Sequence, residues 1–323
     1  MRPYVDLESI TRRYGDFTLG SISLKMGRGS VFTLMGPSGS GKTSLLRVIS
    51  GLDVPESGRI YVNQEDVTNL PPNKRNIGLI FQDLALFPHM SAFDNIAFGL
   101  RSRRLERTAI DAKVEEMAGL LGISKLLERR PGEMSGGERQ RVALARSLVV
   151  EPSLLLMDEP LSSLDPQLRL RVRSELKALI RGLSLTIIYV THDLEDGLYL
   201  GDYAGYMSGG KILESDTVEQ LYINPGTREL AEFLGYNVIE LNGYLLAVHP
   251  RDLKIVTENQ DISGTVKSFG FEGTDIRIDA SIDEKQFLAA LVPFSDVHKK
   301  LEHGIRLGFR ISRSVRLDPG DKP

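Results

Sequence analysis

Eight consecutive residues, 36–43, constrain this chain more than any other segment, and they read Gly-Pro-Ser-Gly-Ser-Gly-Lys-Thr. They fit the pattern G-x-x-x-x-G-K-[ST], whose glycines let successive backbone N–H groups surround phosphate oxygens. An apolar run, 31–35, precedes the segment and a helical pattern, 44–50, follows it. A strand, a loop and a helix in this order direct the positive end of the helix dipole at the phosphate. The segment therefore predicts a phosphate-binding loop.

Composition and charge exclude several classes of protein. The chain has 323 residues and a formal net charge of −3, which gives no electrostatic reason to expect nucleic acid as a partner. Because it has no Cys, disulfides and thiolate metal sites are excluded. No segment approaches the ~18 apolar residues that span a bilayer, and the N-terminus has no signal-peptide pattern. We therefore expect a cytoplasmic chain, with other subunits spanning any membrane that it serves.

Predicted strands and helices alternate around the phosphate-binding loop. Continuous apolar runs at 154–157 and 186–190 are typical of strands buried in a parallel sheet, and 167–183 between them has a helical pattern. This order predicts an α/β sandwich with a mostly parallel sheet. Further strands are expected at 4–7, 17–24, 59–62 and 77–81, and a helical subdomain at about 88–152.

The character of the sequence changes near Gly235. Asn242-Gly243 stands between two apolar runs and predicts a two-residue hairpin, because both turn positions require positive φ. Later strands are expected at 254–256, 262–268, 274–278 and 305–311, a spacing typical of a small β-barrel. We therefore expect one domain over 1–235, with the helices of 218–234 packed in it, and a β-rich domain over 236–323.

A second motif is the apolar strand that ends in Asp158-Glu159. Asp158 at the strand end can bind the hydration shell of Mg²⁺, and Glu159 can orient or deprotonate the water that attacks a γ-phosphate. Four apolar residues before two acids are common in buried strands. The phosphate-binding loop upstream makes the pair specific for a nucleotide hydrolase.

A third motif is Ser135-Gly136-Gly137-Glu138. Ser135 as N-cap with Glu138 three residues later predicts a capping box and a helix over about 138–150. Two adjacent glycines cost helix stability unless a group must approach the backbone closely. Exposed N–H groups at a helix start bind anions, so we expect a second phosphate-binding surface, shared between two subunits.

Met134-Ser-Gly-Gly-Glu138 resembles the signature loop of ATP-binding cassette (ABC) transporters, usually Leu-Ser-Gly-Gly-Gln. The Met and Glu are departures that retain the Ser and the glycines. The other elements of the family follow in its order over about residues 1–235, so the chain resembles the nucleotide-binding subunit. This resemblance implies a P-loop NTPase cassette with a mixed sheet and a helical subdomain, followed by an OB-like β-barrel.

The resemblance also implies roles for single residues. Tyr14 stacks on adenine, Gln82 senses Mg²⁺ and the attacking water, Asp165 lies in the loop that crosses the dimer interface, and His192 contacts the γ-phosphate. The expected catalytic residues are Glu159, His192 and Gln82, and the expected Mg²⁺ residues are Thr43, Gln82 and Asp158. The residues expected to bind ATP are Tyr14, Gly36, Pro37, Ser38, Gly39, Ser40, Gly41, Lys42, Thr43, Ser44, Ser135, Gly136, Gly137 and Asp165.

Partners follow from the same resemblance. A second copy pairs head to tail with the first, transmembrane permease subunits bind at the cytoplasmic face of the membrane, and a solute-binding protein acts indirectly. The C-terminal part resembles the regulatory domain of importers for sugars, polyamines, iron or oxyanions. Its small size favours an inorganic oxyanion (molybdate, tungstate or sulfate) or ferric iron, with a sugar or polyamine as the alternative.

The alternative class comprises the soluble ABC ATPases that act on ribosomes or DNA. Those usually carry two cassettes or a long coiled-coil insertion, whereas this chain has one cassette and no long heptad run. A non-catalytic module is disfavoured by the intact Lys42, Glu159 and His192, and an exporter by the absence of a fused membrane span. We therefore expect an importer ATPase without a nucleic-acid partner.

Overall fold

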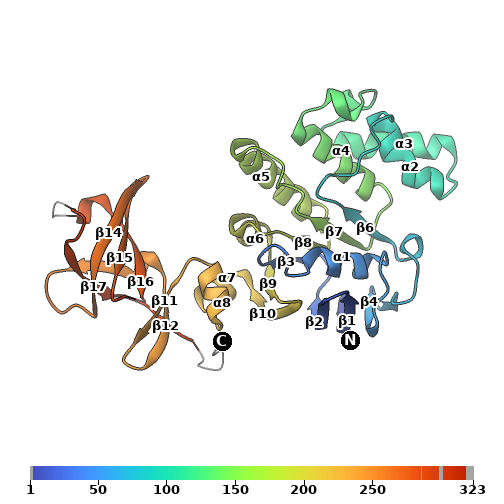
Figure 1. Ribbon diagram of the computed structural model, residues 1–323. Helices are drawn as coiled ribbons and strands as arrows, with labels where there is room; N and C mark the ends of the chain where they lie inside the picture. Colours follow the sequence, from blue (N-terminus) through green and yellow to red (C-terminus); the bar gives the residue numbers. More distant parts are fainter. Residues whose placement is uncertain (1–2, 285, 298–300, 318–323) are drawn as a thin grey trace. The chain divides into compact units, whose positions relative to one another are not determined.

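The computed structural model describes residues 3–284, 286–297 and 301–317. The chain forms two compact units, one ending at Val218 and one beginning at Glu219 (Figure 1). The first unit combines two β-sheets with helices, and the second consists mainly of antiparallel strands.

Six strands form the central sheet of the first unit, in the order β10-β9-β3-β8-β7-β6. Neighbours from β9 to β6 pair in parallel, and β10 pairs antiparallel with β9. Every residue of β3, β7 and β8 is buried, which explains their continuous apolar sequences. The strands are β3 (Val31–Met35), β6 (Ile77–Ile80), β7 (Leu154–Asp158), β8 (Ile187–Val190), β9 (Tyr203–Ser208) and β10 (Lys211–Thr217).

An antiparallel sheet, in the order β2-β1-β4-β5, makes a second layer. Its apolar side chains, such as Leu7 and Ile60, form one core cluster with Leu34 and Ile188 of the central sheet and Leu45 of α1 (Lys42–Ser50). The strands are β1 (Val5–Tyr14), β2 (Phe17–Met26), β4 (Ser57–Val62) and β5 (Glu65–Asp66), and η1 (Pro72–Lys74) is a short 3-10 turn.

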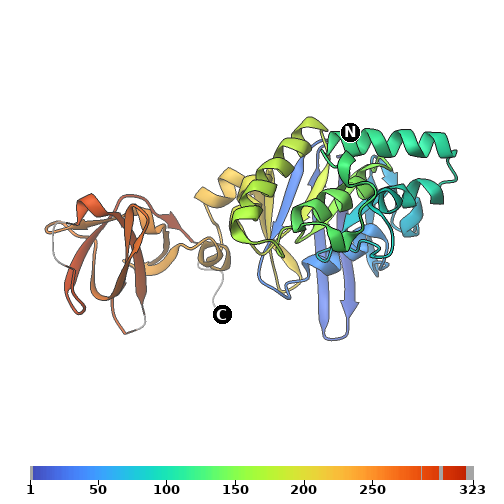
Figure 2. The same ribbon diagram turned by 90° about the horizontal axis from the view of Figure 1, so that it is seen from above.

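Helices cover the other face of the central sheet. Leu155 and Met157 of the sheet share a second core cluster with Ile96, Val142 and Leu176 of these helices. Three helices, α2, α3 and α4, contact one another and lie together as a helical subdomain in both views (Figures 1 and 2). The elements are α2 (Ala92–Ser102), α3 (Arg107–Leu120), η2 (Ser124–Leu126), η3 (Pro131–Glu133), α4 (Gly136–Leu148), α5 (Pro166–Gly182) and α6 (Leu194–Leu200).

The second unit contains two antiparallel sheets, β11-β12-β18 and β13-β17-β14-β15-β16. The expected hairpin is confirmed, because Asn242 and Gly243 have φ of 52° and 77° between β11 and β12. The edge strands β13 and β16 of the larger sheet contact each other around an apolar core, as strands of a barrel do. The elements are α7 (Val218–Ile223), α8 (Arg228–Phe233), β11 (Asn237–Leu241), β12 (Tyr244–Val248), η4 (Pro250–Asp252), β13 (Leu253–Val256), β14 (Ile262–Glu272), β15 (Asp275–Ser281), β16 (Phe287–Pro293), η5 (Phe294–Asp296), β17 (Arg306–Ile311) and β18 (Val315–Arg316).

The compact units divide at a different place from the expected boundary at residue 235. Ala231 of α8 packs with Ala247 and Leu317, and the Tyr236 hydroxyl donates to the carbonyl of Tyr222 in α7 at 2.8 Å. Helices α7 and α8 therefore pack with the second unit rather than with the first. The apolar pattern of these helices predicts that each buries one face, but it does not show which core that face packs against.

Strands β9, β10 and β16 are present in the structure but were not expected from the sequence. Tyr203–Ser208 contains a glycine and no β-branched residue, so its strand conformation depends on pairing in parallel with β3. Within the described residues, no helix has both the length and the apolarity to cross a membrane.

Candidate active site

The predicted site residues follow the carboxyl ends of neighbouring parallel strands. Gly36 follows β3, His192 comes two residues after β8, Glu159 follows β7, and Gln82 comes two residues after β6. Because β3, β8, β7 and β6 are adjacent and parallel, these ends meet at one edge of the central sheet. Ligands of α/β folds bind outside this edge of the sheet.

The loop 36–43 is tightly held by its own chain. The ammonium group of Lys42 donates to the carbonyl oxygens of Gly36 at 2.8 Å and Pro37 at 2.9 Å. Lys42 is only 5% exposed, and burial lowers its pKa despite the nearby carboxylates. The buried hydroxyl of Ser40 has no hydrogen-bond partner among the described residues, as expected of a cradle for a polar ligand.

Glycines shape the loop. Gly41 is the N-cap of α1 with φ of 104°, and a Cβ there would lie 2.5 Å from Cζ of Phe17. A Cβ on Gly36, where φ is 147°, would lie 2.1 Å from the carbonyl oxygen of Met207 in β9. Only glycine fits these two positions, so β2 and β9 determine the conformation of the loop.

Asp158 and Thr43 meet beside the loop. The hydroxyl of Thr43 donates to Oδ1 of Asp158 at 3.1 Å. Asp158 is 7% exposed, and burial, together with the charge of Glu159, raises its pKa. Two oxygen donors of this kind suit Mg²⁺, which commonly adds phosphates and waters to one or two protein ligands. Within the described part of the chain, no group of three or more His, Asp or Glu side chains could hold a metal.

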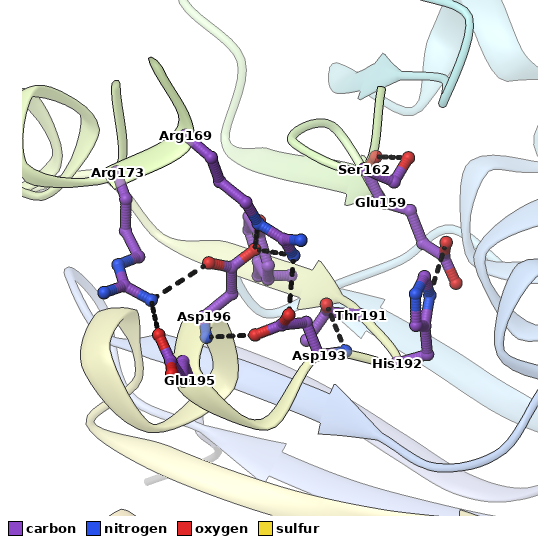
Figure 3. A network of polar contacts seen from close by, with 10 residues as sticks. Glu159, Ser162, Arg169, Arg173, Thr191, His192, Asp193, Glu195 and Asp196 are labelled. Carbon is purple, nitrogen blue, oxygen red and sulfur yellow. Dashed lines mark hydrogen bonds and ion pairs between the residues drawn. The ribbon is translucent and has the colours of Figure 1, made fainter. Parts of the chain in front are cut away.

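Glu159 and His192 face each other across the strand ends (Figure 3). Nδ1 of His192 lies 2.8 Å from Oε2 of Glu159, a hydrogen-bonding distance. The backbone of Glu159 is left-handed, with φ of 45°, and its carbonyl accepts from the hydroxyl of Ser162 at 2.8 Å. Left-handed backbone at a residue other than glycine is uncommon and concentrates at functional sites.

Gln82 and Tyr14 are less enclosed. Gln82 is exposed beyond the end of β6. The hydroxyl of Tyr14 donates to Asp53 at 2.9 Å, and Asp53 also pairs with Arg47 at 2.8 Å. Burial and then Asp53 raise the pKa of Tyr14 to about 12, so the phenol stays neutral. The contact of Tyr14 with Asp53 was not predicted from the sequence, because it joins β1 to the segment after α1, 39 residues away.

The capping box at Ser135 is confirmed. The N–H of Ser135 donates to Glu138 at 2.7 Å, and the hydroxyl of Ser135 accepts from the N–H of Glu138 at 3.3 Å. A Cβ on Gly136 would lie 2.9 Å from a methyl group of Leu164, so a larger residue there would have to displace the Leu164 side chain. The groove beside Ser135 and Gly137 is lined by residues of 122–141 and 168–175 and by none of 36–43.

Asp165 lies at the start of α5. Its carboxylate accepts from the N–H of Leu168 at 3.0 Å, which makes Asp165 the N-cap. In the loop before it, the hydroxyl of Ser162 donates to the carbonyl of Glu159, and the side chain of Leu164 lies beside Gly136. One carboxylate oxygen of Asp165 is thus engaged in capping α5.

Two residues that hold the segment after Gln82 in place were not predicted from the sequence. Arg146 of α4 donates to the carbonyl oxygens of Leu84 and Ala85 at 2.8 and 2.6 Å. Both residues have left-handed backbone, with φ of 61° and 43°, so Arg146 holds a strained turn directly after Gln82. The buried Asn95 binds the next segment through Phe87. The contacts span 8 to 62 residues and leave no local pattern in the sequence.

The strand order, the phosphate loop before α1 and the acidic end of β7 define a P-loop nucleotide hydrolase. A family model described as ABC transporter matches residues 19–162.

Three relatives are each named molybdate/tungstate import ATP-binding protein. The protein of Pyrococcus abyssi is 43% identical over 274 residues, covering 78% of this chain and 80% of the relative. That of Thermococcus kodakarensis is 47% identical over 235 residues, covering 72% and 71%. That of Pyrococcus horikoshii is 46% identical over 275 residues, covering 84% and 79%. The chain therefore belongs to the ABC transporter family, as expected, and it is an import-type ATPase subunit.

Proposed function

We propose that this chain is the ATPase subunit of an importer for molybdate or tungstate. The proposal of the cargo is supported by three relatives, 43 to 47% identical, that are named for import of these oxyanions. The proposal for ATP is supported by the convergence of the phosphate loop, Asp158, Glu159 and His192 at one edge of the sheet. These relatives favour an oxyanion over ferric iron, sugars or polyamines.

In this proposal the loop binds the phosphates of ATP. Backbone N–H groups of residues 36–44 and the ammonium group of Lys42 contact the β- and γ-phosphates, and Lys42 exchanges its two carbonyl partners for them. Tyr14 stacks on the adenine, with its hydroxyl anchored by Asp53. Thr43 and Asp158 would hold Mg²⁺, which neutralises charge on the phosphates when it is bound.

Glu159 is the proposed general base, and its Oε2 takes a proton from the water that attacks the γ-phosphate. His192, hydrogen-bonded to that oxygen, orients the carboxylate and reaches the γ-phosphate. Gln82 completes the site from the neighbouring strand end, where it would contact both the attacking water and Mg²⁺ when the ion is bound. The left-handed backbone of Glu159 directs its side chain away from the strand and toward this space.

A second copy of the chain supplies the rest of the proposed site. Ser135, Gly136 and Gly137 line or border a groove that the phosphate loop of the same chain does not reach. Head-to-tail pairing lets these residues, together with Asp165, close over ATP bound by the other copy. Permease subunits in the membrane, served by a solute-binding protein, would hold this dimer at the cytoplasmic face. Residues 236–323 would form the regulatory domain.

The first experiment is affinity purification of the full chain from its host in mild detergent, with identification of the proteins that accompany it. We expect a multi-span permease and a solute-binding protein. Titration calorimetry of that binding protein should detect molybdate and tungstate, with sulfate, ferric iron, spermidine and maltose as controls. Recovery of ribosomes or DNA complexes instead would contradict transport, and binding of a control alone would contradict the proposed cargo.

Replacing Asp158 by Asn should separate stability from activity. Because burial raises the pKa of Asp158 above its unfolded value, the ionised carboxylate opposes folding above that pKa and does so less as the pH falls. The metal-free variant should therefore unfold at a temperature no lower than wild type at pH 7, while ATP turnover falls by about 100-fold or more. Calorimetry and a phosphate-release assay measure the two effects.

The control for this prediction is Asp16→Asn, at an exposed turn. It should change neither quantity. An Asp158→Asn variant that hydrolyses ATP normally would remove Asp158 from the proposed Mg²⁺ site.

A further inference from the structure

A cluster of charged side chains around the buried Asp196 joins α5 to α6 (Figure 3). The guanidinium of Arg169 contacts Oδ2 of Asp196 through two nitrogens, at 2.6 and 3.1 Å, and Oδ2 of Asp193 at 3.1 Å. Arg173 approaches the other oxygen of Asp196 at 3.4 Å. The side chain of Asp196 is 1% exposed, so its charge is tolerable only because both arginines neutralise it.

The cluster is connected to the proposed catalytic residue His192 through the next residue in the chain, Asp193. Asp193 directly follows His192, and its N–H donates to the hydroxyl of Thr191 at 2.9 Å. Its carboxylate caps α6 by accepting from the N–H of Asp196 at 3.0 Å, in addition to the contact with Arg169. These three contacts hold Asp193 in place. Because His192 is the preceding residue in the chain, they also restrict its position.

At its other end the cluster reaches the loop before α5. Arg169 lies one turn into α5, and its N–H donates to the carbonyl of Asp165 at 2.9 Å. The start of that loop is bound to the catalytic strand, because the N–H of Ser162 also donates to the carbonyl of Glu159, at 3.2 Å. With the His192–Glu159 hydrogen bond, these contacts close a ring that runs through both segments.

We propose that Arg169 is a positioning residue for ATP hydrolysis, which holds His192 against Glu159 through Asp193. A displacement of residues 162–165 moves the first turn of α5, and Arg169 transmits that movement to His192. An arginine suits this task because its planar guanidinium can bind two carboxylates at once in a fixed geometry. The ammonium group of lysine is a point charge and orients its partners less strictly. The inference rests on the proposed role of His192.

An ion pair with a buried carboxylate such as Asp196 needs a reason other than stability. Replacing such pairs by apolar residues is often neutral or stabilising, because the cost of removing the charges from water offsets their attraction. Within the described residues, the side-chain hydrogen bonds and ion pairs of Arg169 are with Asp193 and Asp196, and none is with the phosphate loop or Asp158. Its effect on turnover must therefore pass through α6 and His192.

The experiment is a double-mutant cycle on the full-length chain. Turnover of MgATP is measured for wild type, Arg169→Met, His192→Ala and the double variant. Arg169→Met should lower kcat about tenfold or more and leave KM within about twofold, because it misplaces a reacting group without touching the bound nucleotide. In the His192→Ala background, Arg169→Met should cause no further loss, since coupled residues are not additive.

Two further variants define the control and the rescue. Arg181→Met removes an ion pair with Asp202 at the opposite end of α5 and should leave kcat unchanged. Arg169→Lys keeps the charge and should recover part of the loss seen with Arg169→Met. If Arg169→Met does not fold, as judged by circular dichroism, the cycle is completed with Arg169→Lys.

Three outcomes would overturn the inference: a kcat for Arg169→Met equal to that of Arg181→Met, losses that multiply with those of His192→Ala, or a loss that lies mainly in KM. Normal turnover of His192→Ala would instead contradict the proposed role of His192, and with it the basis of the inference. The two failures are therefore distinguishable.

Discussion

Glu159→Gln is expected to lower ATP turnover by about 1000-fold, a typical loss when a catalytic base is removed, while ATP still binds. The amide keeps the shape of the carboxylate but cannot accept a proton from the attacking water. It can still meet Nδ1 of His192, which lies 2.8 Å from Oε2 in the wild type, so the site should retain its geometry. Because bound ATP is no longer consumed, the two copies should stay joined by it.

Two measurements on the full-length Glu159→Gln chain check this expectation. Phosphate release reports turnover, and size-exclusion chromatography with and without MgATP reports a dimer that appears only with nucleotide. The matched control is Glu65→Gln, on an exposed residue of β5. Wild-type turnover in Glu159→Gln would remove Glu159 from its role as the base. Loss of turnover without a trapped dimer would contradict the proposed pairing.

Gly36→Ala is expected to have the largest effect on stability. Its φ of 147° is unfavourable for a residue with a side chain, and the new Cβ would lie 2.1 Å from the carbonyl oxygen of Met207. Because that oxygen belongs to the backbone of β9, it cannot rotate away. Strain and overpacking together should cost about 3–5 kcal/mol of unfolding free energy in the first unit. This corresponds to about 10 °C in Tm for a unit of this size.

Differential scanning calorimetry of the full-length Gly36→Ala variant measures this loss. The control is Gly132→Ala, because a Cβ there meets nothing within 4 Å and its φ is not positive. That control should change the unfolding free energy by less than about 0.5 kcal/mol. A Tm for Gly36→Ala within about 2 °C of wild type would show that β9 yields to the added methyl group.

Several parts of the structure were predictable because their determinants are local. The strand before residue 36 and the helix after residue 43 follow from a continuous apolar run and a helical pattern. The hairpin at Asn242-Gly243 depends on two adjacent residues that tolerate positive φ. The capping box joins Ser135 to Glu138, three residues apart. In each case the interacting groups are close together in the sequence, so the local residue pattern is enough to predict the interaction.

The order of the strands in the sheet, and the core against which each helix packs, could not be predicted from local patterns. Nothing in the apolar run of β8 shows that it lies between β3 and β7. The helices α7 and α8 were expected in the first domain, yet they pack with the second unit. A buried face is visible in a sequence, but its partner is chosen by the packing of distant segments.

The sequence by itself determined the chemistry of this protein: a phosphate loop, an acidic strand end and a capped pair of glycines, each encoded within a few residues. Tertiary structure alone decided how these parts are held. The Asp53 anchor of Tyr14, the contact of Gly136 with Leu164, and the Arg169 cluster join residues 27 to 39 positions apart. Such contacts depend on the geometry of packed elements, which no local pattern of side chains specifies.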